Sequence, residues 1–195
     1  MIAAVILAAG MATRMGENKL LIEIDGRPLV ARVADAALGA GLAPVVVVTG
    51  HEAHRVQAAL EGRPLTFAHN PDFAAGLAGS LKAGMAVLPV EALGVLVCLG
   101  DMPDVSAAHL SRIVAAFPAN GRAICVPTRH GRRGNPVLLG RPLFPEMQAL
   151  TGDIGARGLI AKHSDLVREV PMDDDAVLTD LDTAESWLAY RRRNR

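Results

Sequence analysis

Short apolar runs alternate with segments of helical periodicity along almost the whole 195-residue chain. Several of the apolar runs are rich in valine and are too short for ordinary helices, which favours buried β-strands. The segments between them repeat apolar residues at spacings of three and four, as helices with one buried face do. Strands separated by helices predict an α/β fold, in which helices cover both faces of a mostly parallel sheet in three layers.

The expected boundaries follow from the apolar runs and from residues that begin or end helices. Pro28 suits a first helical turn, Gly39 suits the end of a helix, and Ser106 is a suitable N-cap. A chain of this length fits one domain, residues 1–195, better than two. We expect strands at residues 2–8, 44–49, 65–69, 94–99, 122–126, 136–139 and 166–170, and helices at residues 28–38, 52–60, 77–88, 106–117, 143–150, 154–161 and 183–190.

The composition argues against several classes of partner. Lys plus Arg and Asp plus Glu both number 20, so a net charge of zero gives no reason to expect nucleic acid or a membrane surface. Aromatic residues are only 3% of the chain, too few for a platform that stacks nucleic-acid bases. No apolar run approaches the roughly 18 residues of a membrane span. We expect a cytoplasmic protein in which Cys98 and Cys125, each inside an apolar run, are buried and reduced.

The loop after the first predicted strand has the composition of an anion-binding site. Small residues let a ligand approach the backbone closely, and the amides of such a loop can point at phosphate oxygens. An arginine and a lysine add a planar fork of donors and a compact charge, which together suit a polyphosphate. The loop matches neither the P-loop pattern nor G-x-G-x-x-G, and the alternative is an ordinary turn with two exposed cations. The residues concerned are Leu7, Ala8, Ala9, Gly10, Arg14 and Lys19.

Asp101 is a candidate metal ligand. It follows the predicted strand at residues 94–99, and a carboxylate at the carboxyl end of such a strand faces the ligand crevice of an open α/β sheet. Mg²⁺ prefers oxygen ligands, commonly one or two carboxylates together with substrate phosphates. From the local sequence alone, Asp101 could equally cap the following turn. The acidic run at residues 173–175 is an alternative on charge, but it is more typical of a solvated turn.

Three further segments have two interpretations each or can be dismissed. Residues 70–80 contain a turn signal and two glycines, and Ser80 either faces a ligand or caps the following helix. The basic turn at residues 129–134 either holds the phosphate of an acceptor or is a solvated hairpin tip. His51 and His54 are three residues apart, so they lack the four-residue spacing of a zinc-protease motif.

Residues 7–19 resemble the signature L-A-A-G-x-x-x-R-M-G-x-x-K of the MobA-like nucleotidyltransferases. The likeness extends along almost the whole chain and is closest to the branch that contains molybdenum cofactor cytidylyltransferase. Asn135 departs from that branch, in which a histidine usually precedes the loop proline. The other resembling blocks are residues 48–51, 70–73, 76–81, 99–103, 131–136 and 180–183.

The resemblance implies a Rossmann-like fold of the GT-A type and a Mg²⁺-dependent transfer of CMP from CTP to the molybdopterin form of the molybdenum cofactor, with release of pyrophosphate. It implies that Arg14 and Lys19 are catalytic residues that stabilise charge on the phosphates. Asp101 and Asp182 would hold the metal, although Asp182 could instead cap the helix that begins near Thr183. The nucleotide-binding residues it implies are Leu7, Ala8, Ala9, Gly10, Arg14, Lys19, Ser80, Gly100 and Asp101.

Ala9 is where we expect the base to be chosen. The cytidylyl branch reads L-A-A-G, whereas the guanylyl branch typically reads L-A-G-G, and the extra methyl would narrow the pocket toward a pyrimidine. A molybdenum hydroxylase is a candidate partner in this interpretation. Two alternatives stay open: a non-catalytic accessory protein that binds the cofactor, and a guanylyl- or other nucleotidyltransferase with a different phosphorylated acceptor.

Overall fold

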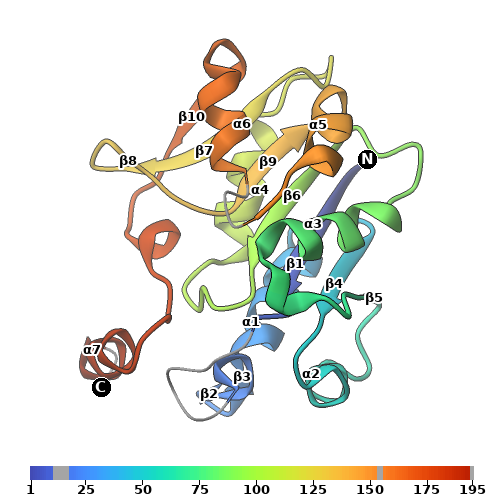
Figure 1. Cartoon of the computed structure of the whole chain (residues 1–195). Helices are drawn as coiled ribbons and strands as arrows, with labels where there is room; N and C mark the ends of the chain where they lie inside the picture. Colours follow the sequence, from blue (N-terminus) through green and yellow to red (C-terminus); the bar gives the residue numbers. More distant parts are fainter. Residues whose placement is uncertain (11–17, 153–155, 194–195) are drawn as a thin grey trace.

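The computed structural model describes residues 1–10, 18–152 and 156–193, and within these residues an eight-stranded sheet runs through the centre of the molecule (Figure 1). Its strands are β1 (Ile2–Ala8), β4 (Val45–Thr49), β5 (Thr66–His69), β6 (Gly94–Leu99), β7 (Ile124–Arg129), β8 (Arg132–Arg133), β9 (Val137–Gly140) and β10 (Val167–Pro171). Their order is β10-β7-β9-β6-β1-β4-β5, with β8 paired to β7. The first strand therefore lies inside the sheet, parallel to β4 and β6.

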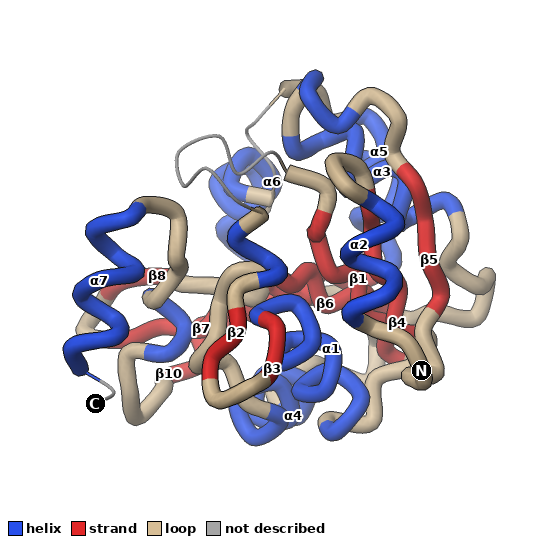
Figure 2. Tube along the Cα trace, turned by 90° about the horizontal axis from the view of Figure 1, so that it is seen from below, coloured by secondary structure: helices blue, strands red, loops and turns tan. Residues whose placement is uncertain are grey.

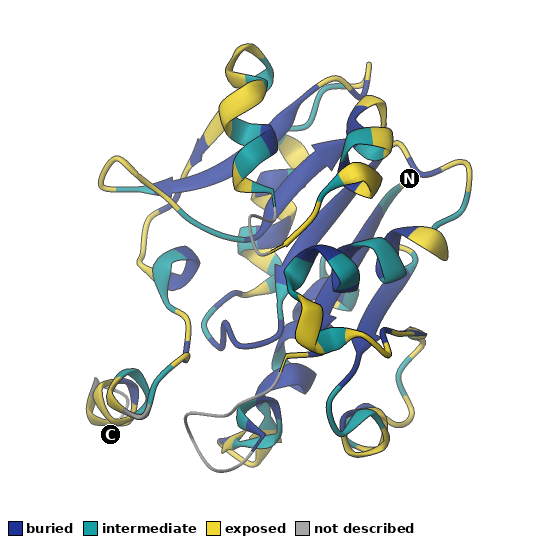
Figure 3. Ribbon diagram, in the orientation of Figure 1, coloured by how far each residue is buried: buried dark blue, intermediate teal, exposed yellow. Residues whose placement is uncertain are grey.

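Helices cover both faces of this sheet, as Figure 2 shows. Successive side chains of β1 point into two different cores, so Ile6 packs with the helices of one face and Val5 with those of the other. Burial on both faces explains why this strand is apolar throughout, and Figure 3 shows the central strands among the most buried parts of the chain. The first core includes α1 (Leu29–Gly39), α2 (Ala53–Ala59) and α4 (Ala107–Ala115), and the second includes α3 (Leu77–Ala86), α5 (Phe144–Ala149) and α6 (Arg157–Lys162).

The predicted three-layer α/β fold is confirmed, and the expected elements recur with small shifts at their ends. Cys98 and Cys125 lie in β6 and β7 as buried free thiols, and burial raises their pKa values to about 12 and about 11. Thiols with such pKa values stay protonated near neutral pH and are poor nucleophiles. Among the described residues, no helix is long and apolar enough to cross a membrane.

The strand β9 is the main departure from a parallel sheet. It lies between β6 and β7 and runs antiparallel to both. The strands β6 and β7 follow one another along the chain, but β9 separates them in the sheet. An apolar run reports burial on both faces of a strand but not the direction of that strand, so the pattern could not predict this order. A second small sheet pairs β2 (Glu23–Ile24) with β3 (Arg27–Pro28), and it precedes α1 directly.

The helix α3 lies close against the sheet because Gly84 has no side chain. A Cβ atom at this position would lie 2.6 Å from Val5 Cγ1 and 2.8 Å from Val48 Cγ2. Alanine stabilises a helix by about 1 kcal/mol relative to glycine. Inserting a methyl group into a filled core typically lowers the stability of the fold by about 1–3 kcal/mol. We therefore expect Gly84→Ala to lower the free energy of unfolding, as measured by urea denaturation. The cost should shrink in a Val5→Ala background, and equal costs in both backgrounds would contradict this packing account.

Candidate active site

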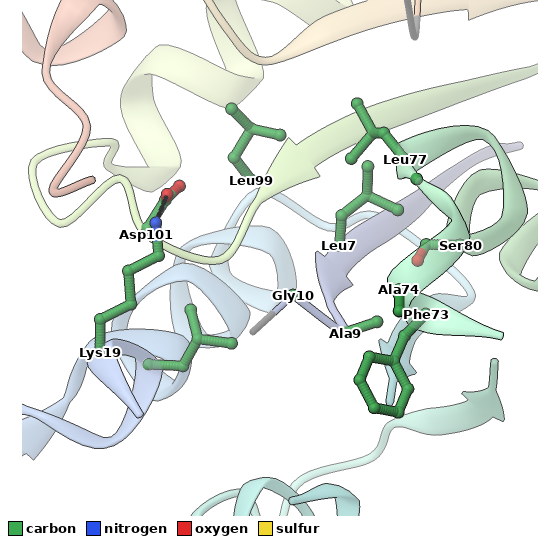
Figure 4. A pocket seen from close by; sticks show the side chains of 12 residues that line it. Leu7, Ala9, Gly10, Lys19, Phe73, Ala74, Leu77, Ser80, Leu99 and Asp101 are labelled. Carbon is green, nitrogen blue, oxygen red and sulfur yellow. Dashed lines mark hydrogen bonds and ion pairs between the residues drawn. The ribbon is translucent and has the colours of Figure 1, made fainter. Parts of the chain in front are cut away.

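A pocket of about 440 Å³ opens at the carboxyl ends of β1 and β6. Figure 4 shows Lys19 and Asp101 at one end of it, and Ala9, Phe73 and Ser80 toward the other. This is the edge at which open α/β sheets bind ligands. The pocket is lined by Leu7, Ala9, Gly10, Lys19, Leu20, Phe73, Ala74, Gly76, Leu77, Ser80, Leu99 and Asp101.

Most of the residues predicted to bind a nucleotide line this pocket, and the others lie beside it or outside the described residues. Ala8 is buried in the core below the pocket. Gly100 packs against Leu7, because its backbone N–H donates to the Leu7 carbonyl at 3.1 Å. Arg14 lies outside the described residues. The structure therefore brings together the two ends of the predicted loop with Ser80 and Asp101.

Lys19 joins two carboxylates that are far apart in the sequence. Its Nζ donates to Asp101 Oδ2 at 2.6 Å, and it also donates to Asp182 Oδ1. Lys19 begins a short 3₁₀ turn, Lys19–Leu21, in which the Asn18 side chain accepts a hydrogen bond from the Leu20 backbone at 3.2 Å. Since Leu20 is buried, this turn fixes the base of the lysine side chain at the pocket.

The pKa values of Lys19 and Asp101 depend on burial and on the neighbouring charges. Burial lowers the pKa of Lys19, but the charge of Asp101 and the hydrogen bonds to Asp101 and Asp182 outweigh burial, so the pKa of Lys19 is raised. Burial raises the pKa of Asp101, the Lys19 charge opposes that rise, and the nearby Asp182 adds to it. Lys19 is therefore a fixed positive charge at neutral pH, and Asp101 is a carboxylate that a second cation would stabilise.

The segment that leads into α7 (Ala184–Arg193) places Asp182 beside Asp101. The Leu181 backbone N–H donates to the Asp101 carbonyl at 3.2 Å, and the Leu181 side chain is buried. Thr183 provides the cap of α7, since its Oγ1 accepts from the Ser186 backbone at 3.0 Å. In the structure Asp182 pairs with Lys19, and the capping role considered for it belongs to Thr183.

Ser80 does not cap α3, because the helix begins three residues earlier, at Leu77, after Gly76. The Ser80 side chain is buried, lines the pocket and accepts a hydrogen bond from Asn70 Nδ2 at 3.1 Å. The sequence indicated a turn at residues 70–72 and a resemblance to the family at residues 70–73, but neither gave the Asn70 side chain a role. A contact between two polar residues ten positions apart leaves no periodic signal in the sequence.

The acidic run at residues 173–175 pairs with basic side chains outside the pocket. Asp173, Asp174 and Asp175 each contact a different basic side chain, with distances of 2.6 Å to Arg112, 3.1 Å to His109 and 3.3 Å to Arg129. This agrees with a solvated turn. Among the described residues, no group of three or more His, Cys, Asp or Glu side chains could hold a metal ion. Any metal at Asp101 and Asp182 would therefore need further ligands from a substrate or from water.

A second cavity of about 500 Å³ adjoins the first and shares Leu77 and Leu99 with it. Arg133 from the predicted basic turn lines it, although this guanidinium also pairs with Glu169 at 3.0 Å. Its other lining residues are Val126, Gly134, Asn135, Val137, Ala156, Arg157, Ile160 and Ala161. No sequence signal pointed to the contribution from α6, because a cavity wall is assembled from segments that are distant in the chain.

This arrangement matches a known family. Residues 4–167 match the MobA-like NTP transferase domain. The chain belongs to that family. All the residues that line the pocket at β1 and β6 lie within the matched segment.

Relatives with curated names fall into two groups: those that match along almost their whole length, and those of which the match covers only a part. Nicotine blue oxidoreductase of Paenarthrobacter nicotinovorans is 31% identical over 188 residues, with 93% of this chain and 92% of that protein covered. The purine catabolism protein PucB of Bacillus subtilis is 31% identical over 205 residues, with 96% and 95% covered. The bifunctional protein GlmU of Kineococcus radiotolerans is 38% identical over 141 residues. The match covers 67% of this chain but only 29% of the length of GlmU.

Solved structures share the fold over the whole chain. A nucleotidyl transferase from Methanothermobacter thermautotroptrophicus superposes with a TM-score of 0.86 at 27% identity, with 99% of this chain and 97% of that chain covered. Rv0371c of Mycobacterium tuberculosis, in a complex with manganese, has a TM-score of 0.78 at 30% identity, with 98% and 96% covered. The chain is thus a nucleotidyltransferase-family protein with the Rossmann-like GT-A fold.

Proposed function

We propose that this protein transfers CMP from CTP to the molybdopterin form of the molybdenum cofactor and releases pyrophosphate. The observation that carries the proposal is the Lys19 ammonium held by Asp101 and Asp182 at one end of a nucleotide-sized pocket. A nucleotidyl transfer needs its triphosphate held in line with the acceptor and its growing charge neutralised. A fixed cation beside two carboxylates that would hold a divalent metal is suited to both requirements.

The two carboxylates support a site for Mg²⁺. Asp101 Oδ1 is buried and has no hydrogen-bond partner among the described residues, so it is a free oxygen ligand next to Lys19. Mg²⁺ takes few protein carboxylates and completes its shell with phosphates and water, as the pair Asp101 and Asp182 would require. When bound, the metal would neutralise the triphosphate. The manganese complex of a 30% identical neighbour is in keeping with a divalent ion in this family.

The protein side chains would act mainly by positioning and by electrostatics. Lys19 would hold the charge that develops on the α-phosphate and on the leaving pyrophosphate, together with Arg14 from the same loop. The backbone around Gly10 would approach the phosphates closely. The terminal phosphate of the acceptor would attack the α-phosphorus, so the bond to pyrophosphate breaks as the new phosphoanhydride forms. No protein nucleophile is needed for this step.

The second cavity supports an acceptor of substantial size. It adjoins the nucleotide pocket at Leu77 and Leu99, so an acceptor in it would reach the α-phosphate. Its walls combine apolar side chains with Arg133 and Arg157, which suits an uncharged ring system that carries a phosphate. We place the reaction in the cytoplasm, where the buried free thiols of Cys98 and Cys125 stay reduced. A molybdenum hydroxylase would then receive the product.

The choice of CTP depends on Ala9 in this proposal. Ala9 lies toward the end of the pocket away from Lys19, which would hold the base (Figure 4). The adjacent Gly50 is packed against Phe73 and the Ala9 carbonyl. We expect Ala9→Gly to reduce the preference for CTP over GTP in kcat/KM by about tenfold, since one methyl in a pocket is worth about 1–3 kcal/mol. Ala8→Gly is the matched control, because it makes the same change at the neighbouring residue, the last of β1, whose side chain lies in the core and not in the pocket. An unchanged CTP to GTP ratio for Ala9→Gly would remove Ala9 from base selection.

The test of the function is pyrophosphate release from each of the four nucleoside triphosphates, with Mg²⁺ and with or without molybdenum cofactor. We expect release from CTP that depends on the cofactor. Release from GTP alone would assign the guanylyl activity instead. Release that requires a sugar phosphate would assign a different acceptor, and no release with any pair would favour a cofactor-binding accessory protein.

A further inference from the structure

Asn70 does not line the pocket but contacts Ser80, which does. Its backbone N–H donates to the Thr49 carbonyl at 2.8 Å, which places Asn70 at the end of β5, and its side chain is buried. Asn70 Nδ2 donates to Ser80 Oγ at 3.1 Å. The space for this amide depends on Gly79, because a Cβ atom there would lie 3.3 Å from Asn70 Nδ2.

The backbone fixes which way the Asn70 amide points. The Asp72 backbone N–H donates to Asn70 Oδ1 at 3.1 Å, and an N–H group can only donate. The oxygen must therefore face Asp72, and the nitrogen must face Ser80. A rotated amide would put two donors against each other at Asp72, and the Asp72 N–H therefore excludes that orientation.

This orientation sets the polarity of the Ser80 hydroxyl. A hydroxyl has one proton and two lone pairs, and here one lone pair accepts from Asn70. Among the described residues no acceptor takes the Ser80 proton, so it can be donated to a ligand in the pocket that Ser80 lines (Figure 4). Cytosine presents two adjacent acceptors, O2 and N3, so a fixed donor suits that base.

We propose that Asn70 is a specificity-determining positioning residue, which acts through Ser80 by holding its hydroxyl as a hydrogen-bond donor to the nucleobase. The proposal rests on the proposed function in that the nucleobase occupies the end of the pocket opposite Lys19. It assigns the recognition of the base to a pair of residues, of which only Ser80 touches the ligand. It predicts that reversing the polarity of the Asn70 side chain changes base recognition without moving the backbone.

Asn70→Asp is the variant that isolates this effect. The new carboxylate has the same shape and can still accept from the Asp72 backbone, but it cannot donate to Ser80. The Ser80 proton would then turn toward the carboxylate and away from the base. We expect the dissociation constant of CTP with Mg²⁺, measured by calorimetry, to rise about tenfold, as the loss of one hydrogen bond predicts. The dissociation constant of ribose 5′-triphosphate, which has no base, should stay unchanged.

The Ser80→Ala background provides the second arm. There the Asn70→Asp change should alter CTP binding less than twofold, because the hydroxyl through which it acts is gone. Equal weakening of CTP and ribose 5′-triphosphate by Asn70→Asp would show that Asn70 only shapes the loop, and would overturn the proposal. A CTP affinity that does not change would overturn it as well.

The outcomes separate this proposal from the choice of CTP. If the wild-type protein binds another nucleotide more tightly than CTP, the cytidylyl assignment fails, and the same comparison with that nucleotide still decides the role of Asn70. If the wild-type protein binds none of the four nucleotides more tightly than ribose 5′-triphosphate, no base is recognised at Ser80, and the proposal is overturned. Thermal melting of each variant checks that the fold is retained.

Discussion

Asp101→Asn is expected to reduce pyrophosphate release at least about 10³-fold, because it removes the buried charge that would hold the metal and that balances Lys19. The substitution keeps the shape of the side chain and its ability to accept a hydrogen bond. Steady-state rates at saturating CTP and Mg²⁺ measure the effect. The binding of molybdenum cofactor should be retained, since the second cavity does not include Asp101.

Asp173→Asn is the matched control for this experiment. Asp173 is also an aspartate in an ion pair, with Arg112 at 2.6 Å, but it lies in the solvated turn at residues 173–175. We expect its activity to stay within about twofold of wild type, because exposed ion pairs contribute little. Full activity in Asp101→Asn would exclude a metal site at this carboxylate.

Lys19→Met is expected to lower the rate of transfer by about 10²–10³-fold and, in the opposite direction, to strengthen the binding of Mn²⁺ in the absence of nucleotide. The first effect follows from the loss of charge stabilisation at the phosphates. The second follows because the ammonium repels a metal ion and occupies two of the carboxylate oxygens, Asp101 Oδ2 and Asp182 Oδ1, for which the metal would compete. We expect Mn²⁺ to bind about tenfold more tightly, which calorimetry or electron paramagnetic resonance would detect.

Lys82→Met serves as the control, since Lys82 lies on α3 and does not line the pocket. It should change neither the rate of transfer nor the affinity for Mn²⁺. If Lys19→Met weakened Mn²⁺ binding, the lysine would instead support the metal site, and the competition would be wrong.

Features that depend on burial were predictable from the sequence, because burial leaves a periodic pattern. The strands β1, β4 and β6 are apolar on both faces, and the loops after β1 and β6 follow at the same edge of the sheet. This is why the sequence could place Asp101 opposite the loop that begins at Leu7. The family signature added Asp182, which no local pattern would have connected with Asp101.

Features that depend on pairing in space were not predictable. The antiparallel strand β9 is apolar and buried, as the parallel strand β1 is, so its sequence does not reveal its direction. The hydrogen bond from Asn70 to Ser80 and the ion pairs of Lys19 join residues that share no sequence spacing. The second cavity draws Leu77 and Arg157 from separate helices, so its existence is a property of packing.

The measurement that tests the central claim most directly follows the two ends of the triphosphate. The protein is incubated with Mg²⁺, molybdenum cofactor and CTP labelled on either the α- or the γ-phosphorus. We predict that the α label becomes attached to the cofactor and that the γ label appears only in pyrophosphate. Release of the γ label as inorganic phosphate, or an α label that never joins the acceptor, would contradict a nucleotidyl transfer.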